Sequence, residues 1–345
     1  MISLGWAELA VLVLALVLFA LGLFTQWRTR QIEERHPPVG DLVEIDGGVI
    51  HVVDRPAQGR ERGAVLLLHG ASGTQADMTM ALQGPLARLG FRVLAVDRPG
   101  HGWSERIFGR LAASPARQAA LVRDALARRG VGRAIVVGHS LSGAIALALA
   151  LDAPEFTRAL ILVAPVSHPW PGGVNWHYRL SATAGIGWAF RQFIVMPLGL
   201  LLLSSGLRSV FEPNDTPADY QRATGLALML RPKHFRANAE DVVDLRPYVV
   251  EQAQRYSEIK APTEIVTGDK DGVVYAHIHS AGCARDIDEA VLTTLSGVGH
   301  APHHSATGAV VGAILSAERR ALEREAAAAE GRSGHEPALS TIWGN

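Results

Sequence analysis

The sequence predicts an α/β fold, in which a mostly parallel central sheet is flanked by helices on both faces. Short, continuously apolar runs alternate with segments of helical pattern, which is typical of parallel strands that are buried on both sides. The alternation stops after Ala164 and resumes at Thr263, so we expect a helical segment inserted into the sheet. A third observation is the six-residue turn Gly138–Gly143, which joins a predicted strand to a predicted helix.

The composition argues against two classes of protein. The chain has 345 residues, no formal net charge at pH 7 and a single cysteine, Cys283. Acidic and basic residues are balanced and no basic face is clustered, so nucleic-acid binding is not expected. One cysteine cannot form an intramolecular disulfide, and we expect Cys283 to be a buried structural thiol. The composition does not indicate an oligomeric state.

Residues 1–27 are predicted to form a transmembrane anchor. After Glu8 the segment carries no charge. A helix over residues 1–24 would be about 36 Å long, enough to cross a hydrocarbon core of about 30 Å. Trp6 and Trp27 flank the apolar run, as aromatic residues do at a membrane interface. A cleaved signal peptide is the alternative, but the positive N-terminal region that it requires is missing.

The residues after the apolar run predict the topology. Arg28, Arg30 and Arg35 follow the span, so the positive-inside rule predicts a single-pass protein with its catalytic domain in the cytoplasm. Residues 28–40 are polar and contain Pro37-Pro38. We expect them to form a short linker.

The main body is expected to begin with a β-hairpin and to continue with alternating strands and helices. The hairpin strands are Leu42–Ile45 and Val49–Val53, joined by Asp46-Gly47-Gly48. The further strands expected are Ala64–Leu68, Phe91–Val96, Arg133–Val137, Ala159–Val163, Thr263–Thr267 and Ala290–Leu295. The helices expected between and after them are Asp77–Leu89, Pro115–Arg129, Ala276–Ala284 and Thr307–Ala329.

These elements divide the chain beyond the linker into three parts. The sheet domain is expected over residues 41–165 and 259–329, with a helical insertion over residues 166–258. The tail 330–345 contains Gly, Ser and Pro and is expected to be disordered. The insertion is rich in Trp, Phe and Leu, but its apolar run Phe193–Leu203 has only about 11 residues, so a second membrane span is not expected.

The turn Gly138-His139-Ser140-Leu141-Ser142-Gly143 carries the clearest chemical signal. A serine at so tight a strand–helix turn is held with its hydroxyl exposed, as a nucleophile requires. The pattern departs from G-x-S-x-G because Ser142 stands at the fifth position. A small residue is needed there so that helix and strand can cross closely, and we interpret Ser142 as a packing residue.

Three further polar segments follow predicted strands. They are His69–Gly73, Gly268–Asp271 and Gly297–His300. Because the carboxyl ends of parallel strands share one edge of a sheet, we expect these segments to meet Ser140 in one cleft. The chain order Ser, Asp, His is the order of the α/β-hydrolase arrangement.

Together with the segment Asp97–Ser104, these motifs resemble the α/β-hydrolase superfamily of esterases, epoxide hydrolases and C–C hydrolases, over roughly residues 40–320. The resemblance implies that Ser140 is the nucleophile, that His300 is its base and that Asp271 orients the imidazole.

The resemblance also implies an oxyanion hole and a cap. The backbone N–H of Leu141, which follows the nucleophile, and that of Ala71 would stabilise the tetrahedral intermediate. Residues 166–258 would form a cap that supplies most substrate contacts.

Two alternatives concern the acid and a metal. Asp269 is the main rival acid, but Asp271 matches the family spacing, and Ala164–Pro171, where some relatives place the acid, has no carboxylate. A metal site could use His300, His303 and His304, or His277 and His279, but no carboxylate or cysteine pattern accompanies these histidines. We therefore expect neither a metal nor another cofactor.

The sequence favours a membrane-anchored serine hydrolase that cleaves a carboxylic ester through an acyl-enzyme intermediate. The apolar cap and the anchor favour a lipophilic substrate, and a cap surface could dip into the bilayer near the anchor. A C–C bond hydrolase, an iminopeptidase, a perhydrolase or an acyltransferase would use the same triad. A non-catalytic binding protein with this fold is the alternative of another class.

Overall fold

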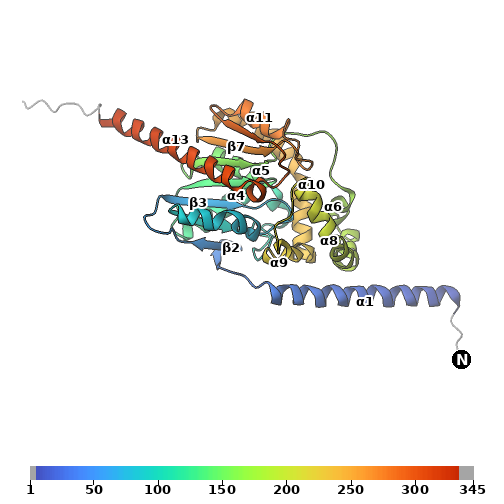
Figure 1. Cartoon of the computed structure of the whole chain (residues 1–345). Coiled ribbons are helices and arrows are strands. Elements are labelled where there is room, and N and C mark those ends of the chain that lie inside the picture. The colour runs from blue at the N-terminus through green and yellow to red at the C-terminus, as the bar shows by residue number, and fades with distance from the viewer. Residues whose placement is uncertain (1–4, 334–345) are drawn as a thin grey trace, which may run out of the picture.

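One eight-stranded sheet organises the molecule, in the order β1-β2-β4-β3-β5-β6-β7-β8 (Figure 1). The structure is a computed structural model that describes residues 5–333. β2 pairs with β1 and with β4 in antiparallel fashion, and all other neighbouring pairs are parallel, which confirms the predicted α/β class. The strands are β1 (Asp41–Ile45), β2 (Gly48–Arg55), β3 (Gly63–Leu68), β4 (Phe91–Val96), β5 (Ala134–His139), β6 (Thr157–Val163), β7 (Thr263–Gly268) and β8 (Val291–Leu295).

Helices cover both faces of the sheet. One face carries α4 (Pro115–Arg128), α5 (Ser142–Asp152) and α11 (His279–Asp286), and the other carries α2 (Gln75–Met78), the π-helical turn η1 (Thr79–Gln83), α3 (Gly84–Arg88) and α13 (Thr307–Ser333). In β3, Leu66 and Leu68 pack on the first face, whereas Val65 and Leu67 pack on the second. A continuous apolar run is therefore what this central strand requires.

Helix α1 (Trp6–Arg35) is longer than the predicted anchor. The expected linker over residues 28–40 is therefore shorter than predicted, because polar helix formers extend the helix, and the Arg28 guanidinium donates to Gln31 Oε1 at 2.6 Å. Only residues 36–40 remain as a linker before β1. Residues 1–4 of the predicted anchor lie outside the described part of the chain.

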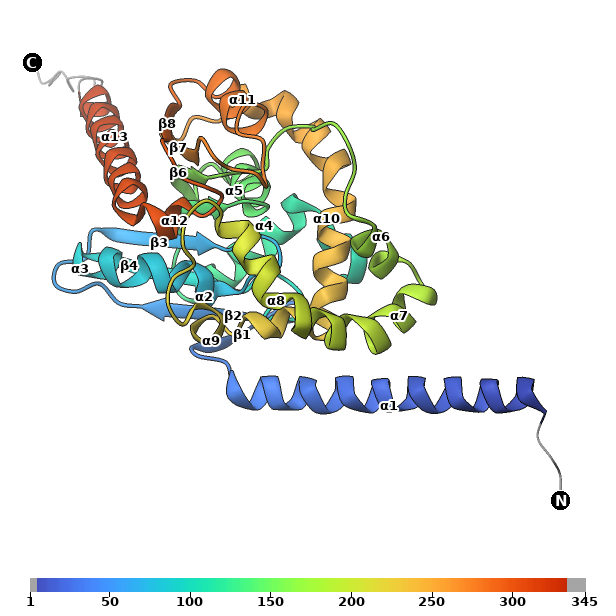
Figure 2. The same cartoon turned by 45° about the vertical axis from the view of Figure 1, so that its right-hand side comes forward.

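The two halves of α1 have different surroundings. Its most apolar stretch of 18 residues has a mean hydropathy of 2.7 and no buried residue, so it is a candidate membrane span, although a signal sequence has the same properties. The second half contacts the body (Figure 2). There Glu33 pairs with Arg231 at 3.0 Å, and just after the helix the His36 carbonyl accepts the Trp103 indole N–H at 3.1 Å.

Every element between β6 and β7 is a helix. These elements are α6 (Trp176–Ala182), α7 (Ile186–Phe190), the π-helical turn η3 (Arg191–Val195), α8 (Met196–Phe211), α9 (Tyr220–Ala223), the 3₁₀ turn η4 (Leu226–Leu230), α10 (Pro232–Gln252) and the 3₁₀ turn η5 (Ala253–Glu258). We call this segment the helical insertion. It packs beside α1 and against the carboxyl edge of the sheet (Figure 2).

Two helices are longer than the sequence indicated. The apolar run of the insertion belongs to a continuous helix, Ile186–Phe211, whose 26 residues are long enough to cross a membrane by length and composition. However, its end is part of the protein interior, because Leu207 and Phe211 are buried with Tyr220. At the C-terminus, α13 continues to Ser333, since the Ala- and Glu-rich sequence favours helix. The expected tail is thus shortened, and residues 334–345 lie outside the described part.

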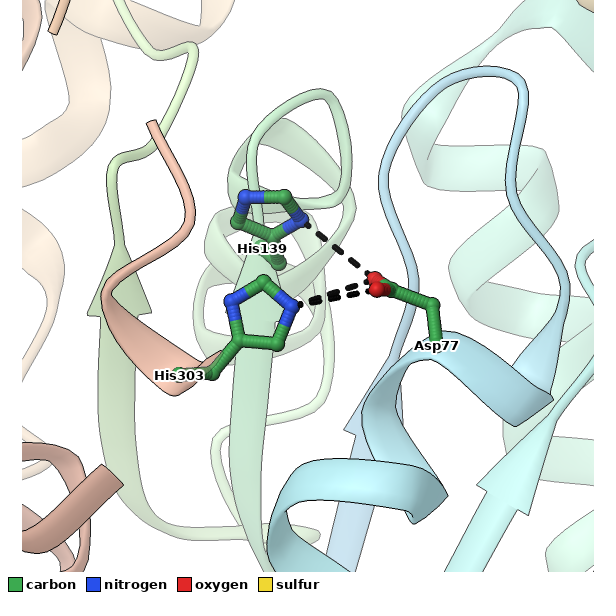
Figure 3. A group of neighbouring side chains, drawn as sticks. All are labelled: Asp77, His139 and His303. Carbon is green, nitrogen blue, oxygen red and sulfur yellow. Dashed lines mark hydrogen bonds and ion pairs between the residues drawn. The ribbon is translucent and has the colours of Figure 1, made fainter. Parts of the chain in front are cut away.

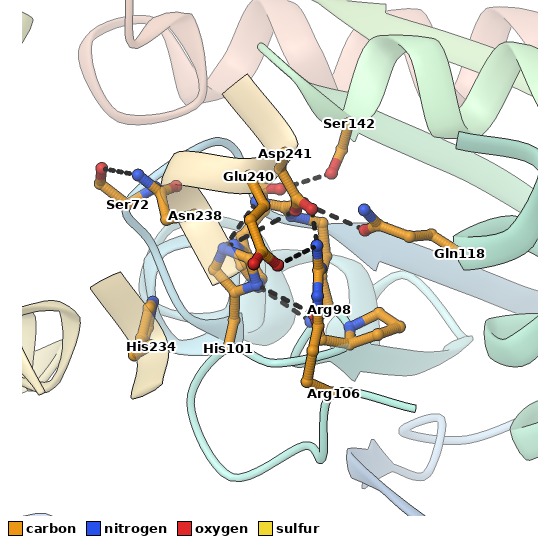
Figure 4. A network of polar contacts seen from close by, with 12 residues as sticks. Ser72, Arg98, His101, Arg106, Gln118, Ser142, His234, Asn238, Glu240 and Asp241 are labelled. Atoms are coloured by element: carbon orange, nitrogen blue, oxygen red, sulfur yellow. Dashed lines mark hydrogen bonds and ion pairs between the residues drawn. The ribbon is translucent and has the colours of Figure 1, made fainter. Parts of the chain in front are cut away.

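Buried charges connect the insertion to the sheet domain (Figure 4). Arg98 follows β4 and Asp241 lies on α10, and both side chains are fully buried with 2.6 Å between Nη1 and Oδ2. Arg106 contacts the other carboxylate oxygen of Asp241 at 2.7 Å. Arg98 also donates to Gln118 Oε1 at 3.1 Å. A buried charge is tolerated only when it is paired in this way.

Replacing Asp241 by Asn is expected to lower the free energy of unfolding by about 3–5 kcal/mol, because the buried Arg98 charge would lose its counterion. Urea unfolding followed by circular dichroism would measure this loss. The matched control is Asp244→Asn on the same helix, where Asp244 pairs with the half-exposed Arg110 at 2.7 Å. That change should cost about 1 kcal/mol or less. Equal losses in the two variants would contradict the buried pairing.

Candidate active site

Ser140 lies at the turn between β5 and α5 and has a left-handed backbone, with φ 54°. The turn is tight because two glycines let strand β5, helix α5 and the segment after β6 approach one another closely. A Cβ at Gly138 would overlap the carbonyl of Ser142, and one at Gly143 would overlap Pro165. Ser142, which departs from the pattern, is fully buried, and its hydroxyl donates to the His69 carbonyl. It therefore ties the elbow to the loop after β3, beyond the packing role expected for it.

The structure brings Ser140, His300 and Asp271 together. His300 Nε2 lies 2.9 Å from Ser140 Oγ, and His300 Nδ1 lies 2.8 Å from Asp271 Oδ2. Asp271 Oδ1 accepts the backbone N–H groups of Val273 and Val274 at 2.8 and 2.9 Å. These bonds leave Oδ2 for the imidazole and fix the carboxylate in place. The arrangement allows His300 to accept the Ser140 proton at Nε2 while it donates to Asp271 from Nδ1.

Asp269, the rival acid, has a different partner. Its Oδ1 accepts the backbone N–H of Gly297 at 2.7 Å, in the loop that leads to His300. Asp269 therefore shapes this loop, and Asp271 is the carboxylate that contacts the imidazole.

The loop after β3 carries Ala71 and lies against the elbow. A Cβ at Gly70 would stand 3.0 Å from the Cβ of Ser140. Within the described residues, the backbone N–H groups of Ala71 and Leu141 donate no hydrogen bond to a protein acceptor. Both groups are thus free for an oxyanion beside Ser140.

Asn238 of α10 holds this loop from the insertion, a role that the sequence did not indicate. Its Oδ1 accepts the backbone N–H of Ser72 at 2.6 Å, and its Nδ2 donates to the Ser72 hydroxyl at 3.0 Å (Figure 4). The guanidinium of Arg98 also donates to the Gly70 carbonyl at 3.3 Å. No local motif marks Asn238, because it lies 166 residues from Ser72.

A buried cluster around Asp77 supports the loop that carries His300. The Asp77 carboxylate accepts the Tyr220 hydroxyl at 2.7 Å, His304 Nε2 at 2.9 Å and His303 Nε2 at 3.2 Å. His139 lies beside His303, with its Nδ1 3.8 Å from Asp77 Oδ2 (Figure 3). Its Nε2 donates to the His300 carbonyl at 3.0 Å. Burial alone would raise the pKa of Asp77, but His303 and His304 hold it well below its usual value.

The same cluster corrects the expectation that no carboxylate accompanies His303 and His304. Ligand atoms of Asp77, His139 and His303 lie within 4.8 Å of one another, and they are donor types that bind zinc. The carboxylate comes from a helix 226 residues away, so sequence spacing could not reveal it. The Asp77 oxygens already accept three donors. The described contacts therefore support a structural role for this carboxylate, as the acceptor that holds Tyr220, His303 and His304. His279 instead accepts the backbone N–H groups of Ser167 and His168.

Known proteins resemble this chain over most of its length. Residues 65–313 match the model of the alpha/beta hydrolase family. An uncharacterised protein of Mycobacterium tuberculosis is 30% identical over 256 residues, which cover 70% of this chain and 71% of the relative. The chain belongs to the alpha/beta hydrolase family.

Solved structures of hydrolases share the fold. The meta-cleavage product hydrolase of Pseudomonas fluorescens has a TM-score of 0.64 at 16% identity, covering 82% of this chain and 99% of that one. The esterase of Exiguobacterium antarcticum has a TM-score of 0.62 at 18% identity, covering 81% and 100%. Identities this low show the common fold and leave the reaction of this hydrolase open.

Cys283 of this hydrolase is expected to be inert while the protein is folded. Its side chain is fully buried on α11, and burial raises its pKa to about 12. Only the thiolate reacts with maleimides, and the raised pKa reduces the thiolate fraction at pH 8 by roughly a thousandfold relative to a thiol with the ordinary pKa near 9. Maleimide labelling should therefore be slow in the native protein and fast in urea. Native labelling at the rate of a cysteine introduced at the exposed Leu322 would contradict this prediction.

Proposed function

We propose that this chain is a membrane-anchored serine hydrolase that cleaves a lipophilic carboxylic ester through an acyl-enzyme intermediate. The observation that carries the proposal is the unbroken hydrogen-bonded series from Ser140 through His300 to Asp271. The hydroxyl, the imidazole and the carboxylate are joined in the order that nucleophilic catalysis uses.

The proposed reaction begins with attack of Ser140 Oγ on the ester carbonyl. His300 accepts the serine proton at Nε2, and Asp271 stabilises the imidazolium that forms. The N–H groups of Ala71 and Leu141 donate to the oxyanion, and the loss of one such donor typically costs about 3–4 kcal/mol of transition-state stabilisation. His300 then returns the proton to the leaving alcohol. Water activated by the same imidazole hydrolyses the acyl-enzyme.

The proposed anchor is helix α1, with the hydrolase domain on the cytoplasmic side. Twenty helical residues from Trp6 would span about 30 Å, and most of these residues are exposed in the molecule, although Thr25 at the end of the stretch is buried. The charged residues Arg28 and Arg30 follow, which supports the proposed orientation. A lipophilic ester is the substrate class that a hydrolase fixed to a bilayer would meet at the highest local concentration.

A fluorophosphonate probe is expected to label the native protein and to leave Ser140→Ala unlabelled, because the probe reacts only with an activated serine. Ser257→Ala, which changes an exposed serine on η5, is the matched control and should label like the native chain. Asp271→Asn should lower kcat by about 10⁴, since the imidazole would lose its orienting charge. A folded native protein that does not label would favour the non-catalytic binding protein instead.

The rate of ester hydrolysis is expected to rise with acyl length. With p-nitrophenyl esters in detergent, kcat/KM should increase at least about tenfold from acetate to octanoate, because each buried methylene contributes up to about 0.8 kcal/mol. Amides, lactones and a C–C cleavage substrate belong in the same panel. Equal rates for short and long esters would rule out the lipophilic substrate. Faster turnover of an amide, a lactone or the C–C cleavage substrate would make that class the proposed substrate in place of an ester.

A further inference from the structure

The helical insertion has an exposed apolar surface next to α1. We call it the lipid face; its members are Trp176, Ile186, Trp188, Ile194, Leu198 and Leu201. All are exposed, with Ile186 at 67% and Leu201 at 81%. In η3 and α8 they recur at intervals of three and four residues, so they form one stripe on the helix. Apolar residues gathered in this way on a protein surface mark an interaction site.

The lipid face is continuous with the proposed membrane span. Phe193 lies against Gly22 of α1, where an added Cβ would stand 3.3 Å from the phenyl ring. The Trp188 indole packs edge-on against the same phenyl ring, with 5.8 Å between ring centroids. Figure 2 shows α7 beside the middle of α1, while the first half of α1 extends beyond the body. The two apolar surfaces therefore meet through Phe193, which contacts Gly22 of α1 and Trp188 of the lipid face.

The contact at Gly22 also sets the depth of the insertion. If the 20 residues from Trp6 to Thr25 span the hydrocarbon core of about 30 Å, Gly22 lies about 5 Å inside its edge. Phe193 and its neighbour Trp188 are then at the depth that interfacial helices reach, about 5–10 Å. The exposed Trp176 and Trp188 are residues that prefer this zone.

Helix α8 joins the lipid face to the catalytic loop. Its first half carries Leu198 and Leu201, whereas its buried end, with Phe211, packs in one cluster with Ala301, which directly follows His300. Just beyond the helix, Asn214 Oδ1 accepts the backbone N–H of Gly299 at 2.9 Å. The ten residues from Leu201 to Phe211 cover about 15 Å. Helix α8 therefore carries both Leu201 of the lipid face and Phe211, which packs against the residue that follows His300.

We infer that the lipid face rests in the membrane interface, and that the cap of this hydrolase takes its ester substrate directly from the bilayer. The inference rests on the proposed function, because it uses α1 as the anchor. It adds a second membrane contact and names the occupant of the apolar surface as lipid. The site then lies above the headgroups, and a long-chain ester reaches it through the insertion.

Site-directed fluorescence in the full-length protein tests the inference. The buried Cys283 allows selective labelling of cysteines introduced as Leu14→Cys in α1, Ile186→Cys in the lipid face and Leu322→Cys on α13. Each variant, labelled with the fluorophore NBD, is inserted into phosphatidylcholine–phosphatidylglycerol vesicles that contain doxyl-labelled lipids. Quenchers near the headgroup should quench the label at residue 186 at least twofold. Quenchers near the chain end should act most on residue 14, and neither should act on residue 322.

The outcomes separate the inference from the proposed anchor. Quenching at residue 14 combined with a water-exposed label at residue 186, like that at residue 322, would overturn the lipid face and leave the anchor intact. A water-exposed label at residue 14 would overturn both. These readouts do not depend on activity, so fluorophosphonate labelling of Ser140 still tests the catalytic proposal separately.

A kinetic comparison tests the role in substrate access. The double variant Ile186→Glu with Trp188→Glu should lower hydrolysis of a long-chain ester in vesicles at least tenfold and leave hydrolysis of soluble p-nitrophenyl acetate unchanged. Leu322→Glu is the matched control and should change neither rate. Unchanged vesicle activity in the double variant would overturn the inferred route. If both activities fell, the cap itself would be damaged, and the fluorescence result would decide.

Discussion

The close crossing of strand β5 and helix α5 at Ser140 is the constraint on which the site depends. The left-handed backbone of Ser140 exists only because Gly138 and Gly143 let strand, helix and the segment after β6 approach closely. This crossing aims the serine hydroxyl at the edge where β3, β7 and β8 also end. His300 and Asp271 then need only short loops to reach it, and their hydrogen bonds complete the series.

The loop after β3, which carries the proposed oxyanion donor Ala71, is held by the helical insertion as much as by the sheet. The Ser142 hydroxyl at the elbow donates to the His69 carbonyl at the start of the loop. Asn238 of α10 accepts the Ser72 N–H, and Arg98, which pairs with Asp241 of α10, donates to the Gly70 carbonyl. A buried ion pair contributes little net stability, but breaking it is costly. Any placement of the insertion that separates the two charges is therefore much higher in free energy. The position of the loop after β3 and the placement of the helical insertion are therefore coupled by the same few contacts.

The arrangement of apolar surface explains why the insertion and α1 belong together. Water would solvate neither the first half of α1 nor the lipid face favourably, and both are exposed in the molecule. With the proposed anchor, a bilayer would cover both surfaces at once, because they meet at Gly22 and Phe193. The Asp77 cluster has the opposite character, since its charge is compensated inside the protein by Tyr220 and the histidines.

The sequence by itself determined the α/β class, the strands and the family, because these depend on local periodicity and on short motifs with fixed spacing. It also named Ser140, Asp271 and His300, which stand at the ends of strands whose order the family resemblance implied. It placed the start of the linker too early, at residue 28, where polar residues continue a helix beyond the apolar run. Only the tertiary structure decided the partners of Asp77 and Asn238, the hydroxyl contact of Ser142 and the position of the lipid face. Such contacts join residues far apart in the chain, and they arise from how whole elements pack, which local spacing does not encode.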